Sequence, residues 1–336
     1  MDYPSNNKSL VDSFGRHHDT LRVSVTDRCN LRCKYCMPEE GVDYLDRDEL
    51  LSYEQLTDVV AVGCQMGISR VRITGGEPLL RQDLPLFIEM LRRKSDVKDI
   101  SLTTNALLLD RQADDLADAG LDRINVSLDS LDPERYAEIT RFGQIEDVWE
   151  GIEAAAEAGI EPIKINTLLL EDFNDDEIDR WVDFVRLRDI TVRFMELMPV
   201  GNNDLAEVGD FFDLTELRQQ LTAKHDLEPA SDAHVGNGPA RYWTAPDWRG
   251  TLGFITPVSN SYCNSCSRLR LTCKGELRSC LAFDDQVQLA HAARRGDDKA
   301  IAAALQWAVD TKRRGHDWNP DEERERTEMG MSEFGG

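Results

Sequence analysis

Hydrophobic and polar residues follow two alternating patterns through the first two hundred positions of the chain. Short runs rich in Val, Ile and Leu are separated by longer stretches in which apolar residues repeat at helical spacing. The predicted strands are 21–25, 70–74, 99–104, 123–129, 163–170 and 191–197. The predicted helices are 52–66, which starts with capping-box spacing, and 83–94, 110–119, 133–158 and 175–188. Short strands alternating with helices predict parallel βαβ units, so we expect an α/β fold with a partial (β/α)6 barrel of the TIM type.

The regular alternation ends near residue 205. A helix-like segment at 214–225 is followed by a Gly, Pro and Asn-rich stretch at 236–239, a cysteine-rich region at 263–280 and an Ala-rich helix predicted over 286–312. We therefore expect a barrel domain over 1–205 and a C-terminal extension over 206–336.

The net charge of the chain limits the classes of partner that it can bind. It carries 63 acidic against 39 basic residues, a net charge of −24, which disfavours nucleic acid and anionic membranes. The acidic residues are spread along the sequence, as expected either for a salt-adapted (halophilic) protein or for an ordinary acidic one. No run approaches the roughly 20 apolar residues of a membrane span, and the polar start lacks a signal-peptide core. We therefore expect a cytoplasmic protein. In that compartment the eight cysteines of the chain are better candidates for metal ligands than for disulfides.

Three cysteines, Cys29, Cys33 and Cys36, follow the first predicted strand directly. Thiolates are soft ligands that favour zinc or iron-sulfur clusters. A structural zinc needs a fourth ligand, and this loop offers none nearby. Three thiolates on a four-iron cluster would leave one iron open to another ligand. Barrel enzymes place their chemistry at the carboxyl ends of the strands, so we expect the active site, and the cations of the strands, at that rim.

The second predicted strand ends in Thr-Gly-Gly-Glu-Pro, residues 74–78. Glycines let a backbone approach a ligand closely, and Glu77 could accept a hydrogen bond from an ammonium group; alone, the motif could equally be a simple turn. Together with the C-x3-C-x2-C loop it resembles the signature of the radical S-adenosylmethionine enzymes. That resemblance implies that the open iron binds the amino and carboxylate groups of S-adenosylmethionine, that Gly76 and Glu77 lie at its methionine end, and that a 5′-deoxyadenosyl radical forms.

A second cysteine group contains Cys263, Cys266, Cys273 and Cys280, which on spacing alone could bind zinc with four thiolates. The surrounding residues 260–270 resemble the C-terminal signature of the GTP 3′,8-cyclases of molybdenum-cofactor biosynthesis. The resemblance extends over nearly the whole chain, through residues 21–29, 70–79, 102–105, 123–129, 193–198 and the terminal Gly335-Gly336. It implies a second 4Fe-4S cluster on Cys263, Cys266 and Cys280, with Cys273 a buried or spare thiol.

The same resemblance implies the reaction: hydrogen removal from C3′ of GTP, then attack of that carbon on C8 of guanine to give (8S)-3′,8-cyclo-7,8-dihydroguanosine 5′-triphosphate. It also implies a terminal Gly-Gly tail, Gly335-Gly336, that is needed for activity. The implied partners are an electron donor, a second copy of the chain in a homodimer, and the downstream cyclic pyranopterin monophosphate synthase. The implied S-adenosylmethionine contacts, beyond the two above, are Tyr35, Ser127 and Met198. The implied GTP contacts are Arg22, Arg72, Thr103, Lys164, Arg193, Arg268, Leu269 and Arg270.

Overall fold

The computed structural model describes residues 9–200, 210–230, 238–319 and 330. Its central unit is the predicted (β/α)6 arrangement, in which six parallel strands alternate with helices. The strands are β1 (Thr20–Ser24), β2 (Arg70–Thr74), β3 (Asp99–Thr104), β4 (Arg123–Ser127), β5 (Ile163–Leu168) and β7 (Thr191–Met195). The helices are α1 (Tyr53–Gln65), α2 (Leu84–Lys94), α3 (Ala113–Asp118), α4 (Pro133–Thr140), α5 (Ile145–Glu157) and α6 (Ile178–Leu187). The predicted fold class is confirmed.

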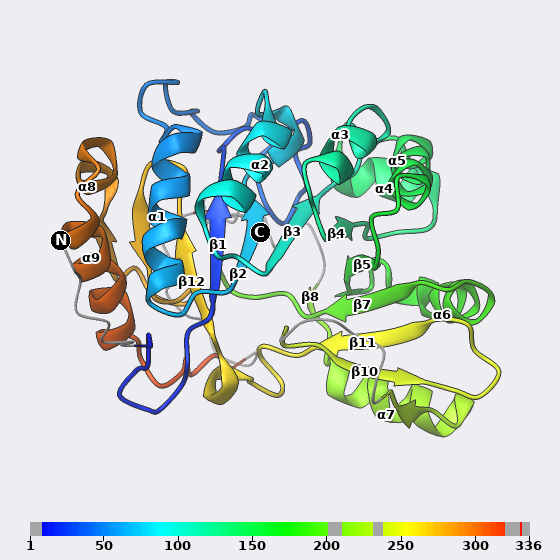
Figure 1. Ribbon diagram of the computed structural model, residues 1–336. Helices are drawn as coiled ribbons and strands as arrows, with labels where there is room; N and C mark the ends of the chain where they lie inside the picture. The colour runs from blue at the N-terminus through cyan, green and yellow to red at the C-terminus, as the bar shows by residue number, and fades with distance from the viewer. Residues whose placement is uncertain (1–8, 201–209, 231–237, 320–329, 331–336) are drawn as a thin grey trace.

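The C-terminal residues continue this sheet at both of its edges (Figure 1). β11 (Thr251–Ile255) pairs in parallel with β7, and β12 (Arg268–Leu271) pairs in parallel with β1. Antiparallel strands then follow outward on each side. These strands are β9 (Glu228–Pro229), β10 (Arg241–Thr244), β13 (Glu276–Arg278) and β14 (Gln286–Gln288). The residues after 205 therefore extend the sheet itself, whereas the sequence had predicted an extension packed against the barrel.

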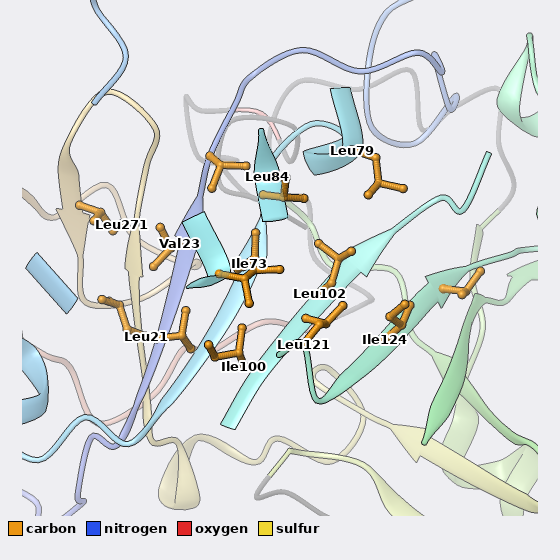
Figure 2. Packing of buried hydrophobic residues seen from close by; sticks show 14 of the residues in the cluster. Leu21, Val23, Ile73, Leu79, Leu84, Ile100, Leu102, Leu121, Ile124 and Leu271 are labelled. Atoms are coloured by element: carbon orange, nitrogen blue, oxygen red, sulfur yellow. The ribbon is translucent and has the colours of Figure 1, made fainter. Parts of the chain in front are cut away.

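Each strand presents one apolar face and one polar face, because successive side chains point to opposite sides of a sheet. Leu21 and Val23 of β1 and Ile73 of β2 lie in the buried apolar cluster that joins the sheet to the helices (Figure 2). The residues between them, Arg22 and Arg72, belong to the other face. Burial of the apolar residues against the helices drives the fold, at roughly 1.5–3 kcal/mol for a fully buried side chain, and leaves the opposite face free for polar groups.

Helix α1 begins as its sequence predicts. The Ser52 side chain accepts a hydrogen bond from the Gln55 amide, and the Gln55 side chain accepts one from the Ser52 amide, which completes a capping box. α7 (Leu214–His225) covers the predicted range and is capped by Asp213. The C-terminal helices α8 (Ala290–Arg295) and α9 (Asp298–Asp310) pack beside α1.

Two predicted helices are broken in the structure. The helix expected over 133–158 is wrong as one element, because it ends at Thr140 and restarts at Ile145. Between the two parts Arg141 has a φ of 65°, outside the helical region, and its guanidinium donates to the carbonyl oxygens of Arg32 and Met37. The break therefore ties this connection to the first cysteine loop.

The helix expected over 286–312 is also wrong as one element. Its start forms strand β14, and the helical remainder is interrupted at Gly296, whose φ of 62° ends α8 in a left-handed turn. The side chain of Asp297 then caps α9 by accepting from the Ala300 amide. Apolar periodicity alone could not locate this interruption, because the alanines on both sides of it are compatible with one continuous helix.

The segment 256–267 runs between the two edges of the sheet. It starts at the carboxyl end of β11, where Ile255 pairs with Met195, and ends at the amino end of β12, where Arg268 pairs with Thr20. It carries Cys263 and thereby brings the second cysteine group to the inner face of the sheet. β6 (Leu170–Glu171) and β8 (Asp210–Phe211) form a small separate ladder. None of the described helices is both long and apolar enough to cross a membrane.

Candidate active site

The polar face of the sheet lines a cavity of about 280 Å³ that contains both cysteine groups. Cys29, Cys33 and Cys36 contribute from the loop after β1. Cys263 and Cys266 contribute from the segment before β12, and Cys280 contributes from the residues that follow β13. Alternate residues of the strands form the wall between the two groups. The sequence-predicted residues that line this cavity, beyond the cysteines, are Arg22, Tyr35, Arg72, Gly76, Glu77, Thr103, Ser127, Arg193, Met198, Arg268 and Arg270.

The first cysteine loop is held by its own backbone and by two cations, Arg32 and Arg141. The Cys36 and Met37 amides donate to the Cys33 carbonyl, and the Arg32 guanidinium donates to the Cys29 carbonyl at 3.0 Å. All three thiols are free. Burial raises the pKa of Cys29 to about 11 and that of Cys36 to about 12, so these thiols need the charge of a metal to lose their protons.

The Gly-Gly turn is packed against the residues that enter this loop. The Gly76 amide donates to the Thr26 carbonyl at 2.8 Å, and the Glu77 amide donates to the Arg28 carbonyl at 2.7 Å. A Cβ on Gly76 would lie 2.2 Å from the Arg28 carbonyl oxygen. Glycine is therefore required at position 76 so that two parts of this chain can pack together, independently of any ligand that the turn also contacts.

Gly76→Ala should accordingly destabilise the site severely. Because the obstacle is backbone, we expect a loss of about 2–3 kcal/mol in unfolding free energy and loss of iron bound by the first cysteine group. Gly238→Ala is the matched control, since a Cβ there meets nothing within 4 Å. Thermal unfolding and iron analysis of both variants test this, and equal stability of the two would contradict it.

Glu77 lies at the wall of the cavity but is already well hydrogen-bonded. One carboxylate oxygen accepts from the Thr104 hydroxyl at 2.7 Å and from the Leu79 amide at 3.0 Å, and the other accepts from the Asn105 amide at 2.8 Å. Burial raises its pKa to about 7. Glu77 therefore joins the ends of β2 and β3, and an ammonium group could reach it only as an additional donor.

Tyr35 is fixed by a buried carboxylate. Its hydroxyl donates to Asp129 at 2.7 Å, and the other oxygen of Asp129 accepts from the Leu168 amide at 2.8 Å. Burial raises the pKa of Asp129 to about 6. Ser127 lies two residues before Asp129, and both Ser127 and Met198 line the same cavity. This side of the cavity combines an aromatic ring, a hydroxyl and a thioether beside the first cysteine group.

Three guanidinium groups stand side by side on adjacent strands. Arg270 of β12 pairs in register with Arg22 of β1, which pairs with Arg72 of β2. Like charges at paired positions of neighbouring strands repel each other and destabilise a sheet. Burial lowers the pKa of Arg22 well below its ordinary value, with further lowering by Arg270 and Arg72, and lowers that of Arg270 to about 10. An anionic ligand bound against this row of guanidinium groups would offset their mutual repulsion.

Several polar atoms on this wall are buried without a partner. The Nε of Arg22, the Nε of Arg193 and the Nη1 of Arg270 have no hydrogen-bond acceptor among the described residues, and the Thr103 hydroxyl and the Asn166 carbonyl oxygen have no partner there either. Buried donors normally find acceptors, because an unmade hydrogen bond costs about 1–3 kcal/mol. The cavity is therefore built for a ligand rich in acceptor oxygens.

Lys164 lines a smaller neighbouring cavity at the amino ends of the strands. The two cavities share Arg22, Arg72, Arg193 and Arg268 on their walls. Burial, and then Arg193 and Arg123, lower the pKa of Lys164 to about 7. The cations thus extend from the middle of the strands toward their amino ends, and the expectation that they gather at the carboxyl rim is wrong. The first cysteine group does lie at that rim, because it follows the end of β1.

The second cysteine group lies in a more positive environment than the first. Burial opposes the thiolate of Cys266, but Arg268 and Lys312 lower its pKa to about 6. Cys273 is not part of this group: it is buried, does not line the cavity, and its carbonyl accepts from the Leu51 amide. Within the described ranges, no three His, Cys, Asp or Glu side chains lie close enough to hold a single metal ion.

The remaining predicted residues are Leu269 and the terminal glycines, and the structure adds residues that had no role in the sequence-based predictions. Leu269 lies in the apolar core at 0% exposure, so only its backbone can face a ligand. Gly335 and Gly336 lie outside the described residues. Arg70 and Arg123 belong to predicted strands and line the smaller cavity, a position that their register in the sheet reveals. Additional lining residues of the larger cavity had no signal in the sequence pattern: Asn166, Tyr262, Lys312, His316 and Trp318.

Comparisons with known proteins match both halves of the chain. Residues 23–185 match the model of the radical SAM superfamily, and residues 190–318 match the model described as Molybdenum Cofactor Synthesis C. A GTP 3′,8-cyclase of Heliobacterium modesticaldum is 43% identical over 97% of this chain and 100% of its own length. A GTP 3′,8-cyclase of Thermodesulfovibrio yellowstonii is 45% identical over 85% of this chain and 89% of its own.

Among solved structures, the chain is similar to Streptococcus suis SuiB bound to S-adenosylmethionine. The TM-score is 0.59 at 16% identity, over 82% of this chain and 64% of that protein. At this identity the similarity concerns the fold alone. It agrees with the sheet and helix arrangement described above.

Proposed function

The chain belongs to the GTP 3′,8-cyclase family, and we propose that its central cavity binds GTP between two iron-sulfur clusters. The enzyme is a radical SAM cyclase that converts GTP to (8S)-3′,8-cyclo-7,8-dihydroguanosine 5′-triphosphate in molybdenum-cofactor biosynthesis. The observation that carries the assignment of the site is the presence of both cysteine groups on one cavity with a row of buried guanidinium groups between them.

Membership of this family implies a 4Fe-4S cluster and S-adenosylmethionine. The residues present fit such a cluster, because three free thiols from one short loop line one cavity. Bound together, cluster and S-adenosylmethionine supply an electron and a carbon radical that can take one hydrogen atom. We assign Cys29, Cys33 and Cys36 as the ligands. Tyr35, Gly76, Glu77, Ser127 and Met198 would orient the cofactor, with the Tyr35 ring fixed by Asp129.

A second cluster on Cys263, Cys266 and Cys280 is part of the proposal. These thiols line the end of the cavity opposite the first group along the strands, since Cys266 lies just before the amino end of β12 whereas Cys29 follows the carboxyl end of β1. Substrate held between them would have its base toward the second group. The chain's contribution is positioning, because a radical must meet one C–H bond and no solvent.

The cations would hold the triphosphate. Arg22, Arg72 and Arg270 lie in one row, with Arg193, Arg268 and Lys164 close by, and each charge-assisted hydrogen bond contributes roughly 1.5–3 kcal/mol. Thr103 adds a hydroxyl from β3, and Leu269 can offer only backbone atoms. In a chain of net charge −24 these groups provide the local positive field that attracts an anionic nucleotide.

The proposal is tested by anaerobic incubation of the reconstituted protein with GTP, S-adenosylmethionine and a reductant. We expect equal amounts of 5′-deoxyadenosine and cyclised nucleotide. Deoxyadenosine without cyclised nucleotide would show that the radical is made but that GTP is not the substrate. Absence of both would contradict the assignment of the first cysteine group.

Lys164 should make GTP binding dependent on pH. Its pKa is about 7 in the free protein, so the ammonium loses its proton as pH rises through 7, whereas a bound phosphate would favour the charged form. We expect KM for GTP to rise between pH 7 and 9, by up to about tenfold per pH unit. In Lys164→Arg the side chain stays charged, and the rise should be much smaller. Identical KM profiles for the two proteins would contradict this role.

The remaining expectations belong to the same proposal. We propose a cytoplasmic homodimer that takes electrons from a separate donor, passes its product to cyclic pyranopterin monophosphate synthase, and carries its acidic surface as an adaptation to high salt. The tail Gly335-Gly336 would act at the active site, and the chain would divide near residue 205 into the barrel and the C-terminal part.

A further inference from the structure

Two buried cations contact the backbone around the second cysteine group. Lys312 follows α9 and is 4% exposed, and Arg16 lies in the N-terminal turn and is 7% exposed. Neither has a role in the assignments above. They come from opposite ends of the chain: Arg16 bonds the backbone of Cys263, and Lys312 bonds backbone close to Cys266 and Cys280.

Lys312 joins the backbone next to two cysteines of this group, Cys266 and Cys280. Its ammonium donates to the Arg268 carbonyl at 2.9 Å, two residues after Cys266, and to the Ser279 carbonyl, directly before Cys280. No carboxylate lies within ion-pair distance of it in the described part of the chain, although it is buried. A buried ammonium without a carboxylate is costly unless an anionic group lies nearby.

Arg16 holds the segment that carries Cys263, the remaining cysteine of this group. One terminal nitrogen of its guanidinium donates to the Cys263 carbonyl and to the Arg314 carbonyl, both at 2.7 Å. The other terminal nitrogen donates to the Arg313 carbonyl at 2.7 Å. The backbone that follows Lys312 is therefore tied to Cys263 through one planar group, a geometry that a lysine could not reproduce.

The position of Arg16 is itself fixed by a buried carboxylate. Its Nε donates to Asp12 at 2.6 Å, and the Nε2 of His18 contacts the same carboxylate oxygen at 3.0 Å. The Asp12 and His18 side chains are fully buried. This arrangement orients the guanidinium toward the Cys263 loop and balances its charge, so that the charge of Lys312 is the one left for a ligand.

We propose that Lys312 and Arg16 are positioning residues of the second metal centre: together they fix the three cysteine-bearing segments, and Lys312 supplies positive charge beside the bound cluster. The inference rests on the second cluster of the proposed function. Three thiolates around a four-iron cluster leave it negatively charged, and each added electron makes it more so. Removing the Lys312 charge should therefore weaken binding of the cluster and make it harder to reduce.

The test compares Lys312→Met, Lys312→Gln and Lys312→Arg with the parent protein, each reconstituted anaerobically as the full chain. Exposed Lys299, near the start of α9, gives the control Lys299→Met. Cys280→Ser marks complete loss of the second cluster. The readouts are iron per chain, the midpoint potential of each cluster, and cleavage of S-adenosylmethionine by the first cluster. Arg16→Lys is measured alongside for iron content.

We expect Lys312→Met to lose about half of its iron while cleavage of S-adenosylmethionine stays within about twofold of the parent. Lys312→Gln can still donate to a carbonyl, so it should retain more iron, with a second cluster of more negative potential. Lys312→Arg and Lys299→Met should resemble the parent, and Arg16→Lys should lose iron from the second group.

Unchanged iron and potentials in both neutral Lys312 variants would overturn the inference. Equal loss of iron from both clusters would also overturn it, since that would indicate general destabilisation. If the parent protein binds only four irons and Cys280→Ser does not change that number, then the second cluster itself is wrong, and the inference fails with it for a separate reason.

Discussion

Cys29→Ser is expected to abolish the production of 5′-deoxyadenosine and of cyclised GTP, by a factor on the order of a thousand or more. The first cysteine group offers three thiols to its cluster, and Cys29 is one of them. A serine hydroxyl is a harder and much less acidic ligand than a thiol, so it binds the iron of a cluster far more weakly. Deoxyadenosine measured after anaerobic reconstitution tests the prediction.

The matched control for this prediction is Cys64→Ser. Cys64 is half-buried on α1, outside the cavity, and its thiol is also free. Its substitution should leave iron content and turnover unchanged. Deoxyadenosine formation by Cys29→Ser at the parent rate would remove the first cysteine group from the mechanism.

Cys280→Ser is expected to uncouple radical formation from cyclisation. The variant should bind about four irons instead of about eight, still cleave S-adenosylmethionine, and form no cyclised nucleotide, because GTP would lose its contact at the second group. Cys280 lines the cavity together with Cys263 and Cys266. Iron analysis and product quantification are the two measurements required.

Cys273→Ser distinguishes this ligand set from a four-thiolate site. Cys273 is 2% exposed and lies behind the cavity wall, and burial raises its pKa to about 12. The variant should keep all its iron and its activity. Equal iron loss in Cys273→Ser and Cys280→Ser would show that the second group uses a different ligand set.

The local features of the chain were predictable because they depend on neighbouring residues. The six central strands were located from runs of β-branched and leucine residues, and β2, β3 and α7 have the predicted bounds. The capping box at Ser52 follows from two side chains three residues apart. The boundaries failed where a tertiary contact decided them, as at Arg141, whose guanidinium bonds the first cysteine loop.

The candidate site was predictable in its chemistry and less so in its layout. The cysteine motifs and the Arg residues in the strands were identifiable from residue type and spacing, and the structure brings them to one cavity. The predicted position of the cations along the strands was wrong, because it was taken from the usual location of active sites in barrels. The pairing register of the strands, which decides it, was not known from the sequence. Arg16, Lys312 and His316 were missed, since a single residue in a turn or after a helix carries no pattern.

The sequence by itself determined where the six central strands lie, which of their faces are apolar, and that two groups of soft ligands and a set of cations are present. Only the tertiary structure decided that β11 and β12 flank opposite edges of one sheet and that Arg16 meets Cys263 across 247 positions. The reason is physical: periodicity and spacing are properties of adjacent residues. Strand pairing and buried contacts between distant segments depend instead on how the whole chain excludes water and satisfies its buried polar groups.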